Sequence, residues 1–120
     1  MDWTAEAMAA LAELEQDGVL AALGKRIKAV RPTKRQYHAA LLRVRMREPF
    51  LVRDLLASWQ LPEAAADDRR IAALVFMVAA LADLAGEARA DWFALARPTL
   101  ERWARAHDPL WSRWSGELAC

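Results

Sequence analysis

The longest apolar stretch of the chain, from Ile71 to Ala82, constrains the fold more than any other feature. Six of its residues recur at the spacing of one helix face, namely Ile71, Leu74, Val75, Val78, Leu81 and Ala82. Phe76 and Met77 lie off that face, so the helix is apolar nearly all round and must be covered on most sides. The stretch is too short to span a bilayer, and Asp83 closes it. We expect a central helix over about residues 68–85, ended by Gly86, with the rest of the chain packed around it.

The composition of the whole chain also favours helices. Its 120 residues are 56% apolar, are dominated by Ala, Leu, Arg and Glu, and include only four glycines. These dominant residues are strong helix formers because their side chains lose little freedom on a helix. No internal repeat or low-complexity linker marks a domain boundary. We therefore expect an all-α fold, a compact single domain over residues 1–120 built of six to seven short helices.

Prolines and capping residues place the boundaries of these helices. Thr33-x-x-Gln36 is a capping-box pattern, and Asp91 is a candidate cap for a helix that Pro98 interrupts and restarts. The expected helices cover about residues 4–17, 19–30, 33–47, 50–61, 68–85, 91–97 and 99–107, with a last turn over 109–114.

The charges are unevenly distributed, although the net charge is only +1. Residues 25–53 hold ten of the seventeen basic residues, opposed only by Glu48, whereas the first 24 residues hold five acidic residues and no basic one. This distribution, and not the net charge, bears on the choice of partner. A polyphosphate backbone is the partner that binds such a basic surface most favourably, because each neutralised phosphate releases counterions.

We therefore interpret residues 25–53 as a basic segment that binds nucleic-acid backbone, largely independently of sequence. In this interpretation the protein is a non-catalytic subunit or regulator of a larger nucleoprotein assembly. The candidate phosphate contacts are Lys25, Lys28, Arg31, Lys34, Arg35, Arg43 and Arg47. We expect them to be exposed and to form one continuous patch, in which Tyr37 and His38 can stack on bases. Two alternatives stay open: the acidic first helix neutralises the segment, or the charges are simply solvated.

The tryptophans favour a rival interpretation, a protein-interaction module such as an adaptor, an inhibitor or a self-associating bundle. Trp111 and Trp114 are three residues apart, so both can face one way at the C-terminal end. Tryptophan is enriched at the centres of protein interfaces. Here Trp111, Trp114 and the acidic first helix are the contact surfaces for a protein partner or a second copy of the chain. The same tryptophans can instead close a core that is poor in bulky residues.

A helix-turn-helix is a narrower possibility. The chain has the required order of helix, turn and helix over residues 50–61, at Pro62 and from about Asp68 onward. Arg69 and Arg70 would then begin the recognition helix. The turn has no glycine, and the second helix is too apolar to leave one face in DNA. Ordinary antiparallel packing of the two helices is therefore the favoured interpretation.

No pattern of residues indicates catalysis, a metal or a cofactor. His38 and His107 have no His, Cys or carboxylate partner at ligand spacing, and Cys120 has no adjacent basic residue that would activate its thiol. A single cysteine excludes an intramolecular disulfide, and no secretory signal is visible. We expect a protein that is not an enzyme, with no cofactor, no metal, no membrane contact and a cytoplasmic location.

Overall fold

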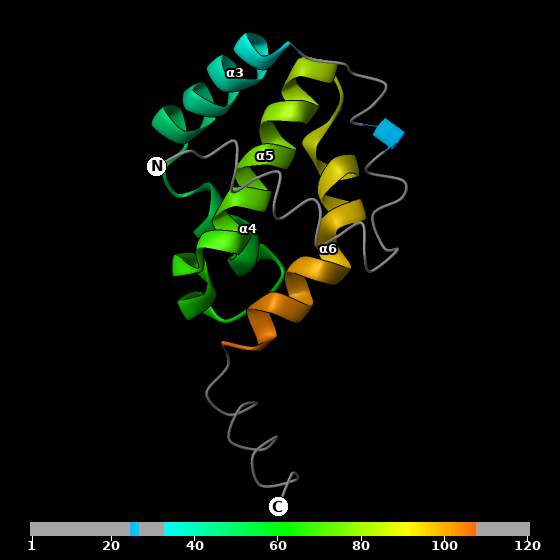
Figure 1. Ribbon diagram of the computed structural model, residues 1–120. Helices are drawn as coiled ribbons and strands as arrows, with labels where there is room; N and C mark the ends of the chain where they lie inside the picture. The colour runs from blue at the N-terminus through cyan, green and yellow to red at the C-terminus, as the bar shows by residue number, and fades with distance from the viewer. Residues whose placement is uncertain (1–24, 27–32, 108–120) are drawn as a thin grey trace, which may run out of the picture.

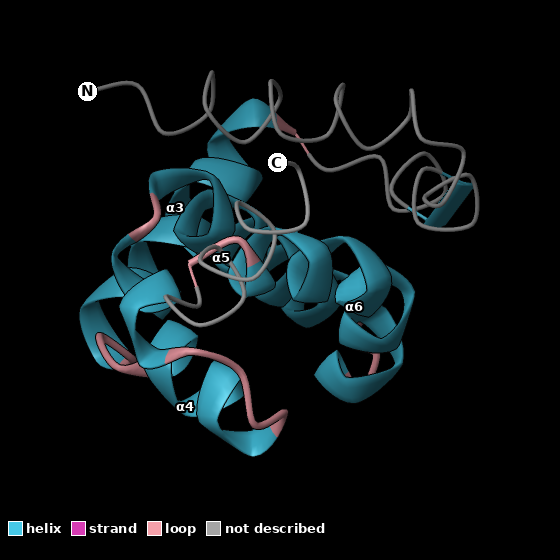
Figure 2. Ribbon diagram, turned by 90° about the horizontal axis from the view of Figure 1, so that it is seen from below, coloured by secondary structure: helices cyan, strands magenta, loops and turns pink. Residues whose placement is uncertain are grey.

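The computed structural model describes residues 25–26 and 33–107. Over these residues the chain forms four α-helices and a 3-10 helix η1, with bounds α3 Lys34–Arg47, α4 Leu51–Ser58, η1 Glu63–Asp67, α5 Arg69–Ala85 and α6 Arg89–Arg105. Figures 1 and 2 show these helices joined by short loops, with no strand in the described part. The all-α prediction is confirmed there.

The predicted number of six to seven helices is not confirmed, because the described residues contain four α-helices. The helix expected over 4–17 and the turn expected over 109–114 lie outside these residues. Of the helix expected over 19–30, only Lys25 and Arg26 are described, and both are helical.

Helix α5 lies at the centre of the fold, between α3 and α6 in Figure 1. Ile71 and an unbroken run from Ala73 to Ala82 are buried. The helix contacts α3, α4, η1 and α6, so its neighbours cover an apolar surface that extends nearly all round it. The predicted central helix is confirmed. Within the described residues no helix is both long enough and apolar enough to cross a membrane.

Local hydrogen bonds set the two ends of α5. Asp68 is the N-cap, and its carboxylate accepts hydrogen bonds from the amides of Arg70 at 2.8 Å and Ile71 at 3.4 Å. At the other end Gly86 has a φ of 67°, and the amide of Glu87 donates to the carbonyl of Ala82. This is the Schellman pattern that a glycine favours, and the predicted stop at Gly86 is confirmed.

Helix α3 begins at the capping box that the sequence predicts. The amide of Gln36 donates to Thr33 Oγ1 at 3.1 Å, and the amide of Thr33 donates to Gln36 Oε1 at 3.0 Å. Ala40, Leu41 and Val44 are buried in the core, and α3 contacts α5. The cap and this apolar face together fix where α3 starts and which side faces the core.

Helix α4 ends at Ser58, before the expected boundary at Leu61. Gln60 has a φ of 57°, and the amides of Gln60 and Leu61 donate to the carbonyls of Ala57 and Leu56. These bonds form a Schellman motif that turns the chain and buries Leu61. Burial of a leucine is worth about 2 kcal/mol. That gain offsets the cost of roughly 1–2 kcal/mol for a left-handed residue other than glycine, and the sequence pattern does not reveal this balance.

Helix α6 contradicts the prediction that Pro98 interrupts it. The helix begins at Arg89, before Asp91, and continues through Pro98 to Arg105. The proline removes one backbone hydrogen bond, to the carbonyl of Ala94, at a cost of about 3 kcal/mol. Both residues are exposed, so water can solvate the freed carbonyl. Burial on both sides of the proline keeps the two halves in one helix, through Trp92, Phe93, Ala96, Leu100 and Trp103.

The burial of α5 also excludes it as a recognition helix. An element that enters a DNA groove needs an exposed face along its length, and α5 has none over residues 71–82. The guanidinium of Arg70, at its start, lies 4.7 Å from the centroid of the Trp103 ring. The helix-turn-helix interpretation is therefore wrong, and ordinary helix packing explains the same sequence.

Candidate nucleic-acid interface

Helix α3 has two apolar sides, and only one of them faces the core. The inner side is Tyr37, Ala40, Leu41 and Val44, which are buried or half-buried in the hydrophobic core. The opposite side carries Ala39, Leu42 and Met46, all exposed, and we call these three residues the apolar ridge. Leu42 is 50% exposed and Met46 is 76% exposed. Within the described residues 25–26 and 33–107 the ridge takes no part in the hydrophobic core, which makes it a candidate contact surface.

Basic side chains lie on both sides of the apolar ridge. Helix α3 contains five basic residues and no acidic one, namely Lys34, Arg35, Arg43, Arg45 and Arg47. Since each residue advances a helix by about 100°, Lys34 and Arg43 lie about 180° apart around the axis. Lys34 and His38 form one flank, Arg43 and Arg47 form the other, and Arg35 lies in line with the ridge. We call these two sets the basic flanks. The single continuous patch that we expected is therefore divided by the ridge.

Several of the basic residues outside α3 are paired with carboxylates. Arg26 pairs with Glu87 at 3.1 Å, Arg53 with Glu63 at 3.8 Å and Arg97 with Glu101 at 2.6 Å. In contrast, Lys34, Arg35, Arg43 and Arg47 are exposed and form no ion pair with any residue in the described ranges 25–26 and 33–107. Their charge is therefore not neutralised from within this part of the chain.

Arg89 explains why Glu48 does not neutralise the basic segment. Its Nη1 and Nη2 donate to Glu48 Oε1 and Oε2, both at 2.7 Å. Its Nε and Nη2 also donate to Asp83, at 2.9 and 2.7 Å. The bonds to Asp83 and Glu48 raise the pKa of Arg89 above its usual range, although burial lowers it. The only carboxylate in residues 25–53 is thus directed to α6.

The structure places four of the seven predicted phosphate contacts on one helix, on both sides of the ridge and in line with it. Lys34, Arg35, Arg43 and Arg47 share α3. Lys25 is exposed, but α5 and α6 lie between α3 and residues 25–26 in both Figure 1 and Figure 2. The remaining predicted site residues, Lys28, Arg31, Trp111 and Trp114, lie outside the described residues.

Of the two predicted stacking residues, only His38 is exposed. Tyr37 lies on the inner side of α3, and burial raises the pKa of its hydroxyl to about 12. Among the described residues its hydroxyl has no hydrogen-bond partner. His38 borders a wide, shallow depression of about 540 Å³ lined by Lys34, Arg35, His38, Ala39 and Leu42. Tyr37 is therefore not available as a stacking platform, whereas His38 is.

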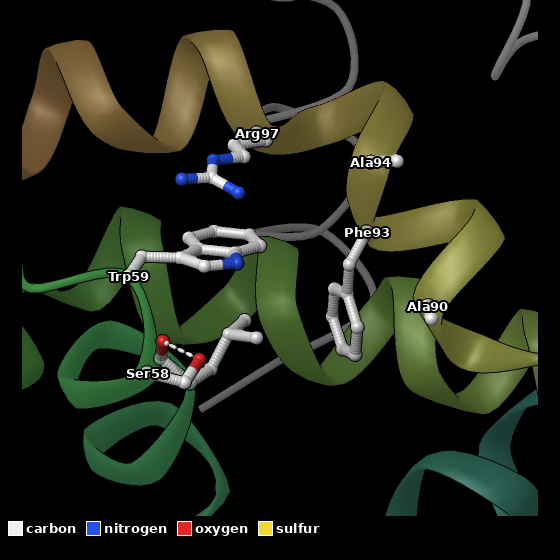
Figure 3. Close-up of a pocket in the computed structure, with 7 residues that line it drawn as sticks. Ser58, Trp59, Ala90, Phe93, Ala94 and Arg97 are labelled. Carbon is white, nitrogen blue, oxygen red and sulfur yellow. Dashed lines mark hydrogen bonds between the residues drawn. The ribbon is translucent and has the colours of Figure 1, made fainter.

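A second hollow lies between α4 and α6, with a volume of about 440 Å³ (Figure 3). Its lining residues are Leu55, Ser58, Trp59, Ala90, Phe93, Ala94 and Arg97. Phe93 meets Trp59 edge-on at 6.5 Å between ring centroids, and the guanidinium of Arg97 lies 5.0 Å from the Trp59 ring centroid. The Ser58 hydroxyl is occupied, because it donates to the carbonyl of Leu55 at 2.7 Å. This α4–α6 cleft offers an apolar and aromatic surface without an acid–base pair.

His107 has a partner that sequence spacing does not reveal. Its Nε2 lies 2.7 Å from Asp68 Oδ2, which links the end of α6 to the N-cap of α5 across 39 positions of sequence. Among residues 25–26 and 33–107 no three His, Cys, Asp or Glu side chains gather closely enough to hold a metal ion. The pair is best explained as a structural link between two helix ends.

Sequence reasoning missed both Arg89 and the apolar ridge. Arg89 is far from Glu48 in the sequence, so no local pattern joins them. The ridge was detectable in principle, since Ala39, Leu42 and Met46 recur at helical spacing on the side opposite Leu41 and Val44. Comparison of the chain with models of known protein families, with characterised proteins and with solved structures gave no match.

Proposed function

We propose that this protein binds nucleic-acid backbone through the outer side of α3, without catalysis, as a subunit or regulator of a nucleoprotein assembly. One observation carries the proposal. Lys34, Arg35, Arg43 and Arg47 are exposed and have no carboxylate partner among the described residues, while Arg89 holds Glu48. Phosphates are the partners that bind such charges most favourably, because each contact releases counterions.

The arrangement supports contacts to the backbone rather than readout of a base sequence. Guanidinium and ammonium groups on a helix surface bind phosphate oxygens, which look alike along any sequence. The side chains that read base edges in a groove are commonly polar, and the ridge between the two basic flanks is apolar. Lys25, Lys28 and Arg31 remain further candidate contacts on the strength of their sequence positions.

Charge reversal on one flank tests this function. We expect Arg43→Glu/Arg47→Glu to lower affinity for labelled DNA or RNA at least tenfold in fluorescence anisotropy titrations. Because two phosphate contacts are lost, the slope of log affinity against log salt should fall by about two. The matched control is Arg69→Glu/Arg105→Glu, which makes the same charge change at exposed positions of α5 and α6.

Two results would contradict the proposal. One is the absence of binding by the unaltered protein at low salt. The other is an equal loss of affinity in the control, because that would show a general effect of net charge and not a site on α3.

A protein-interaction module is the second candidate function, and the α4–α6 cleft favours it. An apolar hollow with Trp59 and Phe93 in its wall suits an apolar side chain of a partner or of a second copy. Ala94→Arg would fill this cleft from an exposed position without removing a core contact. Sedimentation velocity over a wide range of concentrations should then show an assembly for the unaltered protein and a monomer for the variant. A monomer in both cases would remove self-association.

A further inference from the structure

The apolar ridge is exposed to a degree that phosphate binding does not explain. Leu42 and Met46 are 50% and 76% exposed, on the side of α3 that faces away from the core. Contacts to phosphate alone would leave both side chains in water, where their apolar surface contributes nothing. A partner surface that is itself apolar and that lies next to negative charge would cover the ridge and match its basic flanks.

Single-stranded nucleic acid has this combination of surfaces, and duplex does not. In a duplex the base faces are stacked inside, so the helix meets phosphates and the polar edges of the grooves. In a single strand the base faces are open and can pack on apolar or aromatic side chains while the backbone follows basic groups. On the foundation of the proposed function, we infer that α3 binds single-stranded nucleic acid, with phosphates on a basic flank and bases against the apolar ridge.

Two exposed aromatic side chains close to the ridge in sequence fit this inference. His38 is exposed and lines the depression of about 540 Å³ that also contains Ala39 and Leu42. Phe50 is 63% exposed and follows the last residue of α3, Arg47, by three positions. Stacking of bases on such rings tolerates any sequence, because every base has a flat face.

Charge excludes a second copy of α3 as the occupant of the ridge. Two ridges in contact would bring Lys34, Arg43 and Arg47 of one copy against the same residues of the other. Like charges in apposition destabilise such a contact, and α3 contains no carboxylate to compensate. The charge of α3 therefore favours an anionic occupant.

The test compares single strands and duplexes of equal length, in DNA and in RNA, by fluorescence anisotropy. We expect the unaltered protein to bind the single strand more tightly than the duplex. Leu42→Gln/Met46→Gln removes the apolar ridge but keeps charge and helix propensity, so single-strand affinity should fall about tenfold with an unchanged salt slope. Phe50→Ala should also lower the affinity for the single strand. In Phe50→Ala and in Leu42→Gln/Met46→Gln the affinity for the duplex should stay unchanged.

The controls separate this inference from the proposed function. Ala57→Gln places the same side chain at an exposed position of α4 and should bind as the unaltered protein does. Circular dichroism melting should show that the ridge variants remain folded, since the substituted residues are exposed.

Equal affinity for single strand and duplex, with no effect of Leu42→Gln/Met46→Gln, would overturn the inference. If Arg43→Glu/Arg47→Glu still weakens binding, phosphate recognition stands and the ridge is reassigned to an acidic protein partner. If no nucleic acid binds at low salt, the proposed function fails together with the inference.

Discussion

Asp68 shows how one side chain can join two parts of the fold. Its carboxylate caps α5 through the amides of Arg70 and Ile71 and lies 2.7 Å from His107 Nε2 at the end of α6. Burial raises the pKa of Asp68, but the bonds from His107, Arg70 and Ile71 and the charge of Arg70 outweigh that effect. The pKa of Asp68 is therefore lowered, and the ionised form stabilises the folded state.

We predict that Asp68 contributes a pH-dependent part of the stability. A lowered pKa in the folded state gives a contribution that is fully present above the unfolded value near 3.8 and is lost as pH falls through the folded value. Asp68→Ala should lower the free energy of unfolding by about 1–2 kcal/mol at neutral pH, and the difference should shrink at pH values below 3.8. Urea denaturation measured at several pH values checks this.

Asp68→Asn is the informative control for that experiment. Asparagine keeps an oxygen that caps the helix but carries no charge, so this variant should retain most of the stability and lose the pH dependence. A difference between Asp68→Ala and the unaltered protein that stays constant down to low pH would rule out the ionic contribution.

At the scale of elements, Arg89 determines how α3 is held. Its side chain bridges Glu48, just after α3, and Asp83, near the end of α5, from the first position of α6. The planar guanidinium makes two bonds to each carboxylate, a geometry that a lysine ammonium cannot reproduce. This bridge fixes the end of α3 that carries Arg43, Met46 and Arg47.

We predict that Arg89→Ala destabilises the protein by about 1–2 kcal/mol, because it leaves two carboxylates facing each other at half-exposed positions. Arg89→Lys should recover only part of that loss. Arg89→Ala should also bind nucleic acid more weakly, since Glu48 is then free to oppose the positive charge of the basic flanks. Thermal melting and anisotropy measure the two effects.

Arg53→Ala serves as the comparison for Arg89→Ala. It removes a long, exposed ion pair of 3.8 Å to Glu63 and should change the stability by less than about 0.5 kcal/mol. Similar losses in the two variants would show that the Arg89 bridge adds nothing beyond a surface ion pair.

At the scale of the whole molecule, the charges that support the proposed function are separate from those that hold the fold. Arg89 and Arg97 are paired within the fold, whereas Arg43 and Arg47 have no ion-pair partner in the described part of the chain. A surface of unpaired like charges is tolerated because solvent screens it and because the opposite side of α3 packs against the core.

We predict that Arg43→Glu/Arg47→Glu leaves the stability nearly unchanged while it weakens nucleic-acid binding. No ion pair to a described residue is lost. Two glutamates near the C-terminal end of α3 interact unfavourably with the helix dipole, at a cost of less than about 1 kcal/mol. Chemical denaturation checks this. A large loss of stability would mean that these arginines hold the fold together and are not reserved for a ligand.

Local signals identified the elements that depend on short-range chemistry. The capping box at Thr33, the cap at Asp68 and the stop at Gly86 act within a few residues, so their bonds are visible as spacing in the sequence. The end of α4 and the course of α6 were predicted wrongly. Burial of Leu61 and packing on both sides of Pro98 overrode the local signals there.

By itself the sequence determined the helical class, the central position of α5 and the concentration of positive charge in residues 25–53. These properties follow from residue type and spacing, which act locally. Only the tertiary structure decided that Glu48 bonds to Arg89 and that the segment of residues 25–26 lies away from α3. Both features depend on contacts between residues far apart in the chain, which no local spacing encodes. The spacing of Ala39, Leu42 and Met46, in contrast, already marks the apolar ridge in the sequence.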